Sequence, residues 1–335
     1  MALPRRAAVI ALALVAGGAP APSRVAFELP DRDLFPEGIA WDRARGTVFV
    51  GSLRQQRIVA RERDGTWRSL GDDAALGAVL GLEVDTERRA LWAVHCFAAP
   101  GEGPALLHDD PARRGETGVV RFDLDGGAVT AFTATPAPPG CLNDLEITRD
   151  GAVVVTAGDA GLWRLPPGGD TLAPWLRDAP GYANGIASTA DGTKLVVAIA
   201  ERGLAAVDPQ RPAWRMLATP AGAELRGIDG LVRHGDDLLA VRNGTDPAAV
   251  LRIVLGGDAR TITAVEVLEA GHPRHAVPTT AAVVDDALFY VATSQLDRID
   301  RRDGSFDPTT LVPTTILALP LHDDARGAGG CLHRR

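Results

Sequence analysis

The hexapeptide EGIAWD at residues 37–42 opens with an acidic residue and a glycine and continues with alternating apolar positions. Related hexapeptides recur along the chain: LGLEVD (80–85), NDLEIT (143–148), NGIAST (184–189), DGLVRH (229–234) and TAAVVD (280–285). Their first residues lie 43, 63, 41, 45 and 51 positions apart. This spacing is typical of a four-stranded blade, so we predict an all-β, six-bladed β-propeller with four antiparallel strands per blade.

The segments after each hexapeptide support this interpretation. Short runs rich in β-branched and aromatic residues follow turns of Asp, Gly or Arg, as in Thr47–Val50 and Leu288–Val291, and such runs are typical of strands. A propeller must also close, because an open ring leaves an unpaired strand edge. We expect the N-terminal segment Val25–Leu29 to close it by forming the outer edge of the last blade, which contains Thr314–Leu319.

The first 21 residues have the pattern of a signal peptide. Arg5 and Arg6 precede a short apolar run at 7–16, and Ala19-Pro20-Ala21 offers a cleavage site. We therefore predict a signal peptide at 1–21, a propeller domain at 22–321 and a disordered polar tail at 322–335, in a periplasmic or secreted protein. An N-terminal anchor or ordered helix is the alternative for 1–21. No other segment is long and apolar enough to span a membrane.

Charge and cysteine content narrow the function classes. The net charge of -8 gives no electrostatic support for a nucleic-acid partner. We expect a small-molecule substrate and a monomeric protein. The three cysteines, Cys96, Cys141 and Cys331, exclude a fully paired disulfide framework and show no zinc spacing. Cys96 and Cys141 could pair in an oxidising compartment, although buried free thiols are the interpretation that we slightly favour.

The residue that opens each repeat is expected to line the central channel at one level. The six such residues are Glu37, Leu80, Asn143, Asn184, Asp229 and Thr280. Four of them carry carboxylate or amide oxygens, and crowding these groups on an axis is costly unless a cation compensates. Calcium accepts six to eight oxygen ligands with flexible geometry. We therefore predict a Ca²⁺ site, with Zn²⁺, Mn²⁺ or Mg²⁺ as other possible ions.

Any one of these four residues alone is more often a turn residue than a ligand, because Asn, Asp and Gly before a strand are common in turns. The prediction rests on their shared position in the repeat.

The motifs around these residues resemble those of the regucalcin/gluconolactonase-like superfamily: PEGIAWD (36–42), LNDL (142–145), ANGI (183–186) and IDGL (228–231). The resemblance covers the chain from Val25 to about Leu321. It implies a six-bladed propeller whose axial calcium polarises a lactone or ester carbonyl, or a phosphoryl group. It also implies that Glu37, Asn184 and Asp229 hold the metal and that Asn143 touches metal or substrate.

The same resemblance makes Asp229 the candidate base or nucleophile, the alternative being that Asp229 is only a ligand and a His is the base. Sugar-lactonases of this family often carry a substrate-binding Arg two residues before the third-blade Asn. Here Cys141 stands at that position, which weakens the expectation of an aldonolactone substrate.

Second strands return to the level of the predicted metal, so the residues that end them are expected at the substrate entrance. These are Ser52, His95, Arg242 and Asn243, with His272 and His275 in a nearby loop. His95 is a candidate general base, and Arg242 and Asn243, with Asn143, are candidate substrate-binding residues. A partly exposed His95 without a role is the alternative. The insertion at 98–117 is expected to project over the entrance as a lid.

Three functions compete. The first is a metal-dependent hydrolase of lactones or related esters, and the second is a non-catalytic propeller with a structural calcium. The third, a strictosidine-synthase-like condensing enzyme, is disfavoured because that branch resembles the fold without the ligand set. Fold alone does not decide among them.

Overall fold

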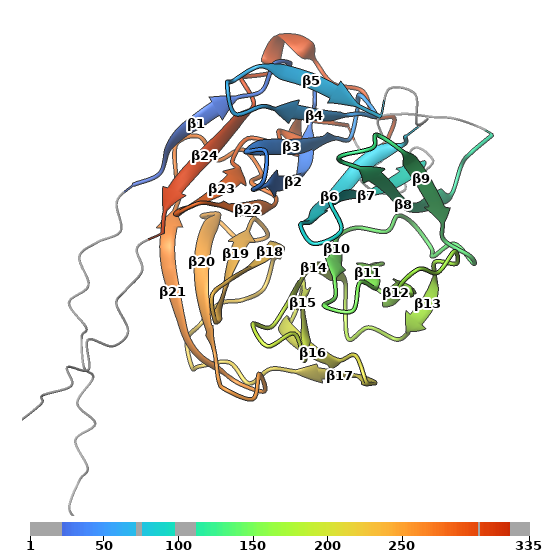
Figure 1. Ribbon diagram of the computed structural model, residues 1–335. Coiled ribbons are helices and arrows are strands. Elements are labelled where there is room, and N and C mark those ends of the chain that lie inside the picture. The colour runs from blue at the N-terminus through green and yellow to red at the C-terminus, as the bar shows by residue number, and fades with distance from the viewer. Residues whose placement is uncertain (1–21, 72–75, 98–111, 301, 322–335) are drawn as a thin grey trace, which may run out of the picture.

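The computed structural model describes residues 22–71, 76–97, 112–300 and 302–321. Six four-stranded antiparallel sheets surround one central axis (Figure 1). The helical elements of the described residues are two 3₁₀ turns, η1 (Leu296–Arg298) and η2 (Pro308–Thr310). The six-bladed propeller predicted from the repeat is confirmed.

The first three blades follow one another along the chain, each from its inner to its outer strand. Blade one contains β2 (Pro36–Asp42), β3 (Thr47–Ser52), β4 (Ile58–Arg61) and β5 (Trp67–Leu70). Blade two contains β6 (Ala78–Asp85), β7 (Ala90–Phe97), β8 (Glu116–Asp123) and β9 (Val129–Thr133). Blade three contains β10 (Leu145–Ile147), β11 (Val153–Thr156), β12 (Leu162–Leu165) and β13 (Ala173–Leu176).

The remaining blades complete the ring. Blade four contains β14 (Ala183–Ser188), β15 (Leu195–Ile199), β16 (Gly203–Asp208) and β17 (Arg211–Met216). Blade five contains β18 (Ile228–His234), β19 (Asp237–Arg242), β20 (Ala249–Leu255) and β21 (Ile262–Ala270). Blade six contains β22 (Ala281–Val284), β23 (Ala287–Val291), β24 (Thr315–Pro320) and β1 (Arg24–Glu28).

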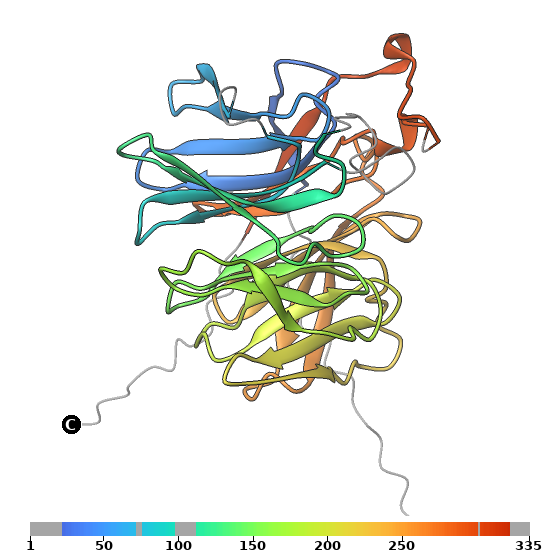
Figure 2. The same ribbon diagram turned by 90° about the vertical axis from the view of Figure 1, so that its right-hand side faces the viewer.

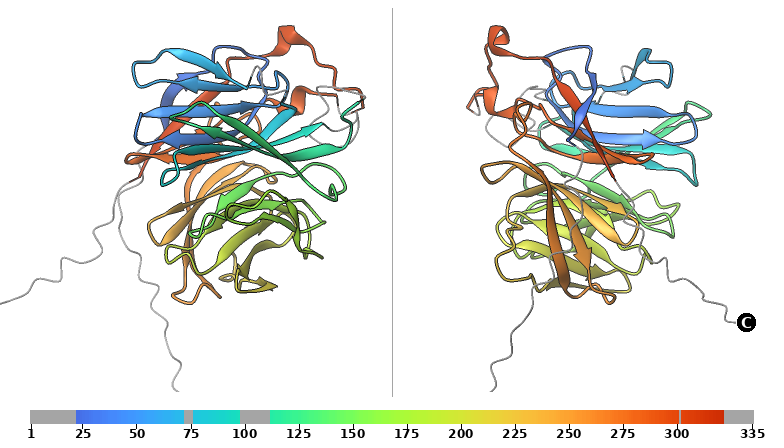
Figure 3. Two further views of the ribbon diagram at one scale, coloured as in Figure 1. Left: turned by 45° about the vertical axis from the view of Figure 1, so that its right-hand side comes forward. Right: turned by 90° about the vertical axis from the view of Figure 1, so that its left-hand side faces the viewer.

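The N-terminal strand closes the ring as expected. β1 pairs antiparallel with β24, with Phe27 opposite Ile316, and the two strands lie side by side in Figures 1 and 3. The amide of Leu29 extends the ladder by donating to the carbonyl of Thr314 (2.9 Å). Closure therefore leaves blade six made of strands from both ends of the described chain.

Apolar side chains of adjacent blades pack against each other because alternate residues of a strand point to opposite faces. One cluster between blades two and three contains Trp92, Leu142 and Val153. On the face opposite the predicted entrance, Arg89 donates to both carboxylate oxygens of Asp42 (2.7 and 2.9 Å). The Asp42 side chain is fully buried and that of Arg89 is 24% exposed, so this pair fastens blade one to blade two near the surface.

Two connections depart from short turns. The insertion predicted between the second and third strands of blade two lies there, although Glu116 and Thr117 already belong to β8; residues 98–111 fall outside the described chain, so the predicted lid stays a prediction. The β23–β24 connection, with η1 and η2, projects from one face of the propeller (Figure 2). The predicted signal peptide and tail also fall outside the described residues. Within the residues described, no helix has the length and apolarity to cross a membrane.

Candidate functional site at one end of the axial channel

The six repeat-opening residues lie at one level around the axis, and contacts across each blade interface show this. Every blade touches the next through the backbone or side chains at these positions. The contacts are Gly38 with Leu80, Gly81 N–H to Asn143 O (2.9 Å), Ile186 N–H to Asp144 Oδ2 (3.2 Å), Gly185 with Asp229, Gly230 N–H to Thr279 O (3.0 Å) and Thr280 Oγ1 to Glu37 O (2.5 Å).

Glycine follows four of the six repeat-opening residues, which we call the ring residues. The reason is steric. A Cβ on Gly185 would collide with the carbonyl oxygen of Asp229, and a Cβ on Gly230 would lie 2.6 Å from Thr280 Cα. Only glycine lets neighbouring inner strands approach so closely. Blade three carries Asp144 at this position instead, and its carboxylate accepts from the amides of Leu145 and Ile186 (2.9 and 3.2 Å).

Asp229 is held by two amide side chains. Asn184 Nδ2 donates to its Oδ1 (2.7 Å) and Asn243 Nδ2 donates to its Oδ2 (2.5 Å). Asn243 also donates to the carbonyl of Pro278 (2.9 Å), which fixes this amide between blades five and six. Burial raises the pKa of Asp229 to about 6, although the two amide hydrogen bonds act to lower it. The carboxylate is thus oriented and more basic than usual.

Glu37 faces the same point from blade one. Glu37 is only 5% exposed, and its Oε2 atom is buried without a hydrogen-bond partner among the described residues. Burial raises its pKa well above the ordinary value, and the nearby carboxyl groups of Asp229 and Asp144 raise it further. Buried polar atoms are normally hydrogen-bonded in native proteins, so an unpaired carboxylate oxygen near a second carboxylate suits a positively charged partner.

Asn143 and Tyr182 complete the described site. Asn143 is 7% exposed, and its Nδ2 donates to the phenol oxygen of Tyr182 (3.5 Å). Burial raises the pKa of Tyr182, and the charges of Glu37 and Asp229 add to this effect. Neither Tyr182 nor Asp144 was predicted from the sequence to be a site residue. Their positions in the sequence could have indicated both. Tyr182 stands two residues before Asn184, and Asp144 follows Asn143 where most repeats have glycine.

Comparison with solved structures identifies this architecture. No family model and no curated protein matches the chain. A gluconolactonase from Xanthomonas campestris is 18% identical, with 91% of this chain and 97% of that chain covered and a TM-score of 0.57. The two chains share a β-propeller fold.

Other solved propellers match with similar or higher TM-scores. A luciferin-regenerating enzyme is 16% identical, with 89% and 95% of the two chains covered and a TM-score of 0.59. The major allergen Mala s 1 of Malassezia sympodialis is 16% identical, with 90% and 97% covered and a TM-score of 0.67. At these identities the likeness shows the fold alone, and function has to be argued from the site.

Two residues expected at the entrance are buried instead. Ser52 is fully buried and its hydroxyl donates to the carbonyl of Leu34 (2.7 Å), so it stabilises a turn. His95 is 2% exposed, and burial lowers its pKa to about 4, with the charge of Arg113 adding to this effect. The expectation of a partly exposed His95 is wrong, because its ring packs edge-on against Phe97 and its Nδ1 accepts from the amide of Gly77 (3.4 Å).

The other entrance residues are more accessible. Arg242 is half-buried at the end of β19, where it donates to the carbonyl of Glu224 (2.9 Å). Asn243 holds Asp229, as described above. His272 and His275 line, together with Asn243, a cavity of about 520 Å³ between the loops of blades five and six. Asn243, which holds Asp229, thus also borders this cavity.

Cys96 and Cys141 form a disulfide, so the free-thiol interpretation is wrong. The bond joins β7 of blade two to the segment that carries Asn143. It occupies the position where the resemblance predicted a substrate-binding Arg in sugar-lactonases. At this position the chain therefore has a disulfide that fixes the segment carrying Asn143.

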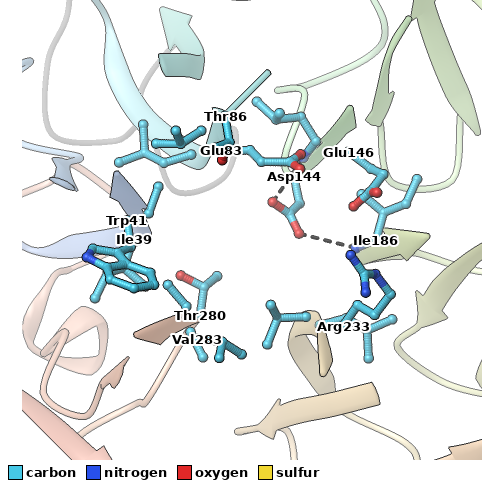
Figure 4. Close-up of a pocket in the computed structure, with 18 of the residues that line it drawn as sticks. Ile39, Trp41, Glu83, Thr86, Asp144, Glu146, Ile186, Arg233, Thr280 and Val283 are labelled. Atoms are coloured by element: carbon cyan, nitrogen blue, oxygen red, sulfur yellow. Dashed lines mark hydrogen bonds between the residues drawn. The ribbon is translucent and has the colours of Figure 1, made fainter. Parts of the chain in front are cut away.

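The opposite end of the axial channel is also polar. A cavity of about 420 Å³ is lined there by Glu83, Asp144, Glu146, Arg233 and Trp41, among others. In Figure 4 these side chains surround one opening, with Trp41 across from Arg233. Burial raises the pKa of Asp144 and of Glu146 to about 7 and that of Glu83 well above the ordinary value.

Among the described residues, no three His, Cys, Asp or Glu side chains come together as a metal-binding group. The ring near Asp229 combines two carboxylates, Glu37 and Asp229, with the amides of Asn143 and Asn184. Such an all-oxygen set suits a hard cation rather than zinc or copper. With the unpaired Glu37 Oε2, the donor chemistry fits calcium.

Proposed function

We propose that this protein is a calcium-dependent hydrolase of lactones or related esters that acts at the Asp229 end of the axial channel. The observation that carries the proposal is the unpaired, buried Oε2 of Glu37 beside an Asp229 carboxylate whose two oxygens are both held. Burying two like charges without compensation is costly. A binding site is the ordinary reason for a fold to keep such a pair.

The cation would be held by Glu37, Asn143, Asn184 and Asp229. When bound, it would supply a Lewis acid that polarises the substrate oxygen. Glu37 and Asn143 are nearly fully buried, which suits them to permanent binding. The gluconolactonase described above has the same fold, and this likeness supports the reaction class without deciding the substrate.

Asp229 is the residue we assign to proton transfer or nucleophilic attack. As a base, it takes a proton from water while the water oxygen adds to the carbonyl carbon, and the proton then passes to the leaving alcohol oxygen. Asn184 and Asn243 hold its carboxylate in one orientation during this step. The cavity of about 520 Å³ beside Asn243 offers room for the remainder of the substrate.

A panel of lactones and aryl esters tests the proposal, assayed with calcium and with chelator. We expect wild-type turnover to vanish in chelator and in Asp229→Asn, and to persist in Asp258→Asn, which removes an exposed carboxylate. Calcium that raises the melting temperature without any turnover would instead favour a non-catalytic propeller with a structural cation.

We further propose that the protein is secreted or periplasmic. The Cys96–Cys141 disulfide supports this assignment, since such bonds persist in oxidising compartments. Fractionation of cells that express the full chain, with N-terminal sequencing of the mature protein, tests it. Recovery of the uncleaved chain from the cytosol would contradict it.

A further inference from the structure

Tyr182 lies at the ring with its phenol oxygen beside Asn143, and its proton has no acceptor among the described residues. Asn143 Nδ2 donates to the phenol oxygen (3.5 Å), so that oxygen is the acceptor of this contact. A phenol has one O–H to donate in addition. This O–H is therefore available to a bound molecule at the ring.

We propose that Tyr182 is a catalytic residue whose hydroxyl donates a hydrogen bond to the substrate oxygen on which negative charge develops. The inference rests on the proposed hydrolase function. In that reaction the water oxygen bonds to the carbonyl carbon, the carbonyl π pair moves to its oxygen, and the pair returns as the C–O bond to the leaving alcohol breaks. Tyr182 keeps its proton throughout, so it adds no step to the proton balance.

A phenol keeps its proton at neutral pH, because its ordinary pKa is about 10. A donor placed in a partly buried site near the reacting oxygen stabilises a developing oxyanion more than it stabilises the neutral carbonyl. The effect should therefore appear in kcat rather than in KM.

Backbone and side-chain contacts fix the position of Tyr182. The backbone amide of Tyr182 donates to Glu201 Oε2 (3.0 Å) and its carbonyl accepts from the amide of Ala200 (2.9 Å). On blade three, the aromatic ring lies against Gly158, where a Cβ would stand 2.8 Å from Tyr182 Cε2. Gly158 has a positive φ of 54°, so this close approach depends on the absence of a side chain.

This packing supplies a matched pair of test variants. Gly158→Ala would push the tyrosine ring away from Asn143. Gly222→Ala places alanine at another positive φ, 82°, with nothing within 4 Å of its Cβ. Both variants place a Cβ at a positive φ, and only the Cβ at position 158 would meet Tyr182. Gly158 and Gly222 therefore separate the effect on Tyr182 from a general loss of stability.

The experiment measures kcat, KM and calcium affinity for wild type, Tyr182→Phe, Gly158→Ala and Gly222→Ala on the best lactone or ester. We expect Tyr182→Phe to lower kcat about 100-fold, the usual loss for one oxyanion donor, with KM and calcium affinity nearly unchanged. Gly158→Ala should lower kcat as well, and Gly222→Ala should not. Binding of a phosphonate monoester, a tetrahedral anion, should weaken at least about tenfold in Tyr182→Phe.

The outcomes separate the two proposals. Wild-type turnover with an unchanged kcat and phosphonate affinity in Tyr182→Phe overturns the role of Tyr182 and leaves the hydrolase intact. A parallel loss of calcium affinity in Tyr182→Phe also overturns it, because the phenol would then act through Asn143 on the metal site. A wild type without turnover on any ester overturns both.

Discussion

The substitution Asp229→Asn should stabilise the metal-free protein while it removes activity. Burial raises the pKa of Asp229 from 3.8 to about 6. At about 1.4 kcal/mol per pH unit, the ionised carboxylate therefore costs the folded state about 3 kcal/mol at pH 8. Asparagine has the same shape without the charge, and Asn184 can turn its amide to accept the new donor.

The sign follows from proton linkage. A carboxyl whose folded pKa is raised binds more protons in the folded than in the unfolded protein between pH 4 and 6. The free energy of unfolding therefore falls as pH rises through that window. Wild type should lose this contribution by pH 8, whereas Asp229→Asn should not. The advantage of the variant should be near 3 kcal/mol at pH 8 and near zero at pH 4.

Denaturant unfolding in chelator at pH 4, 6 and 8 measures the difference, with Asp258→Asn as the exposed control. Thermal unfolding should show a rise on the order of 5 °C or more at pH 8, given roughly 2–4 °C per kcal/mol for large domains. Saturating calcium should raise the stability of wild type and leave the variant unchanged. An advantage that is absent at pH 8, or undiminished at pH 4, would refute this account of Asp229.

Three further predictions follow from other contacts. Replacing Cys96 and Cys141 together by alanine should cost about 4 kcal/mol for a loop of 45 residues and weaken calcium binding, both measured by unfolding with and without calcium. Arg89→Ala should cost about 3–5 kcal/mol because it strands the buried Asp42 carboxylate, whereas Arg45→Ala, an exposed pair member, should cost less than about 1 kcal/mol; equal losses in denaturant unfolding would contradict the role of burial. Calcium binding near neutral pH should release protons, detected by calorimetry in two buffers of different ionisation enthalpy, and a buffer-independent heat would contradict the raised pKa values at the ring.

The sequence predicted the blades and the ring because both depend on periodicity. A repeat fixes which residue opens each inner strand, and the closed ring then places equivalent residues at one level, as the Gly81–Asn143 and Thr280–Glu37 contacts show. Closure by the N-terminal strand followed from the same logic. These features need only the order of apolar and polar residues along the chain.

Features that depend on the neighbouring blade were beyond the sequence. The Cys96–Cys141 bond depends on how blade two meets blade three. Tyr182 reaches Asn143 from another blade only because Gly158 leaves space for its ring. One sequence carries no direct signal for such contacts between blades.

The acidic axis explains why a site of this kind costs stability. Glu37 and Asp229 face each other at one end, and Glu83 and Glu146 lie at the other, all with raised pKa values caused first by burial. Asp144 lies between them and accepts two backbone amides, so its charge has a structural use. Asp229 accepts two side-chain amides, but Glu37 Oε2 is unpaired. A cation at the ring would give that pair its counter-charge, so binding should stabilise the fold and favour ionisation of the same carboxyl groups.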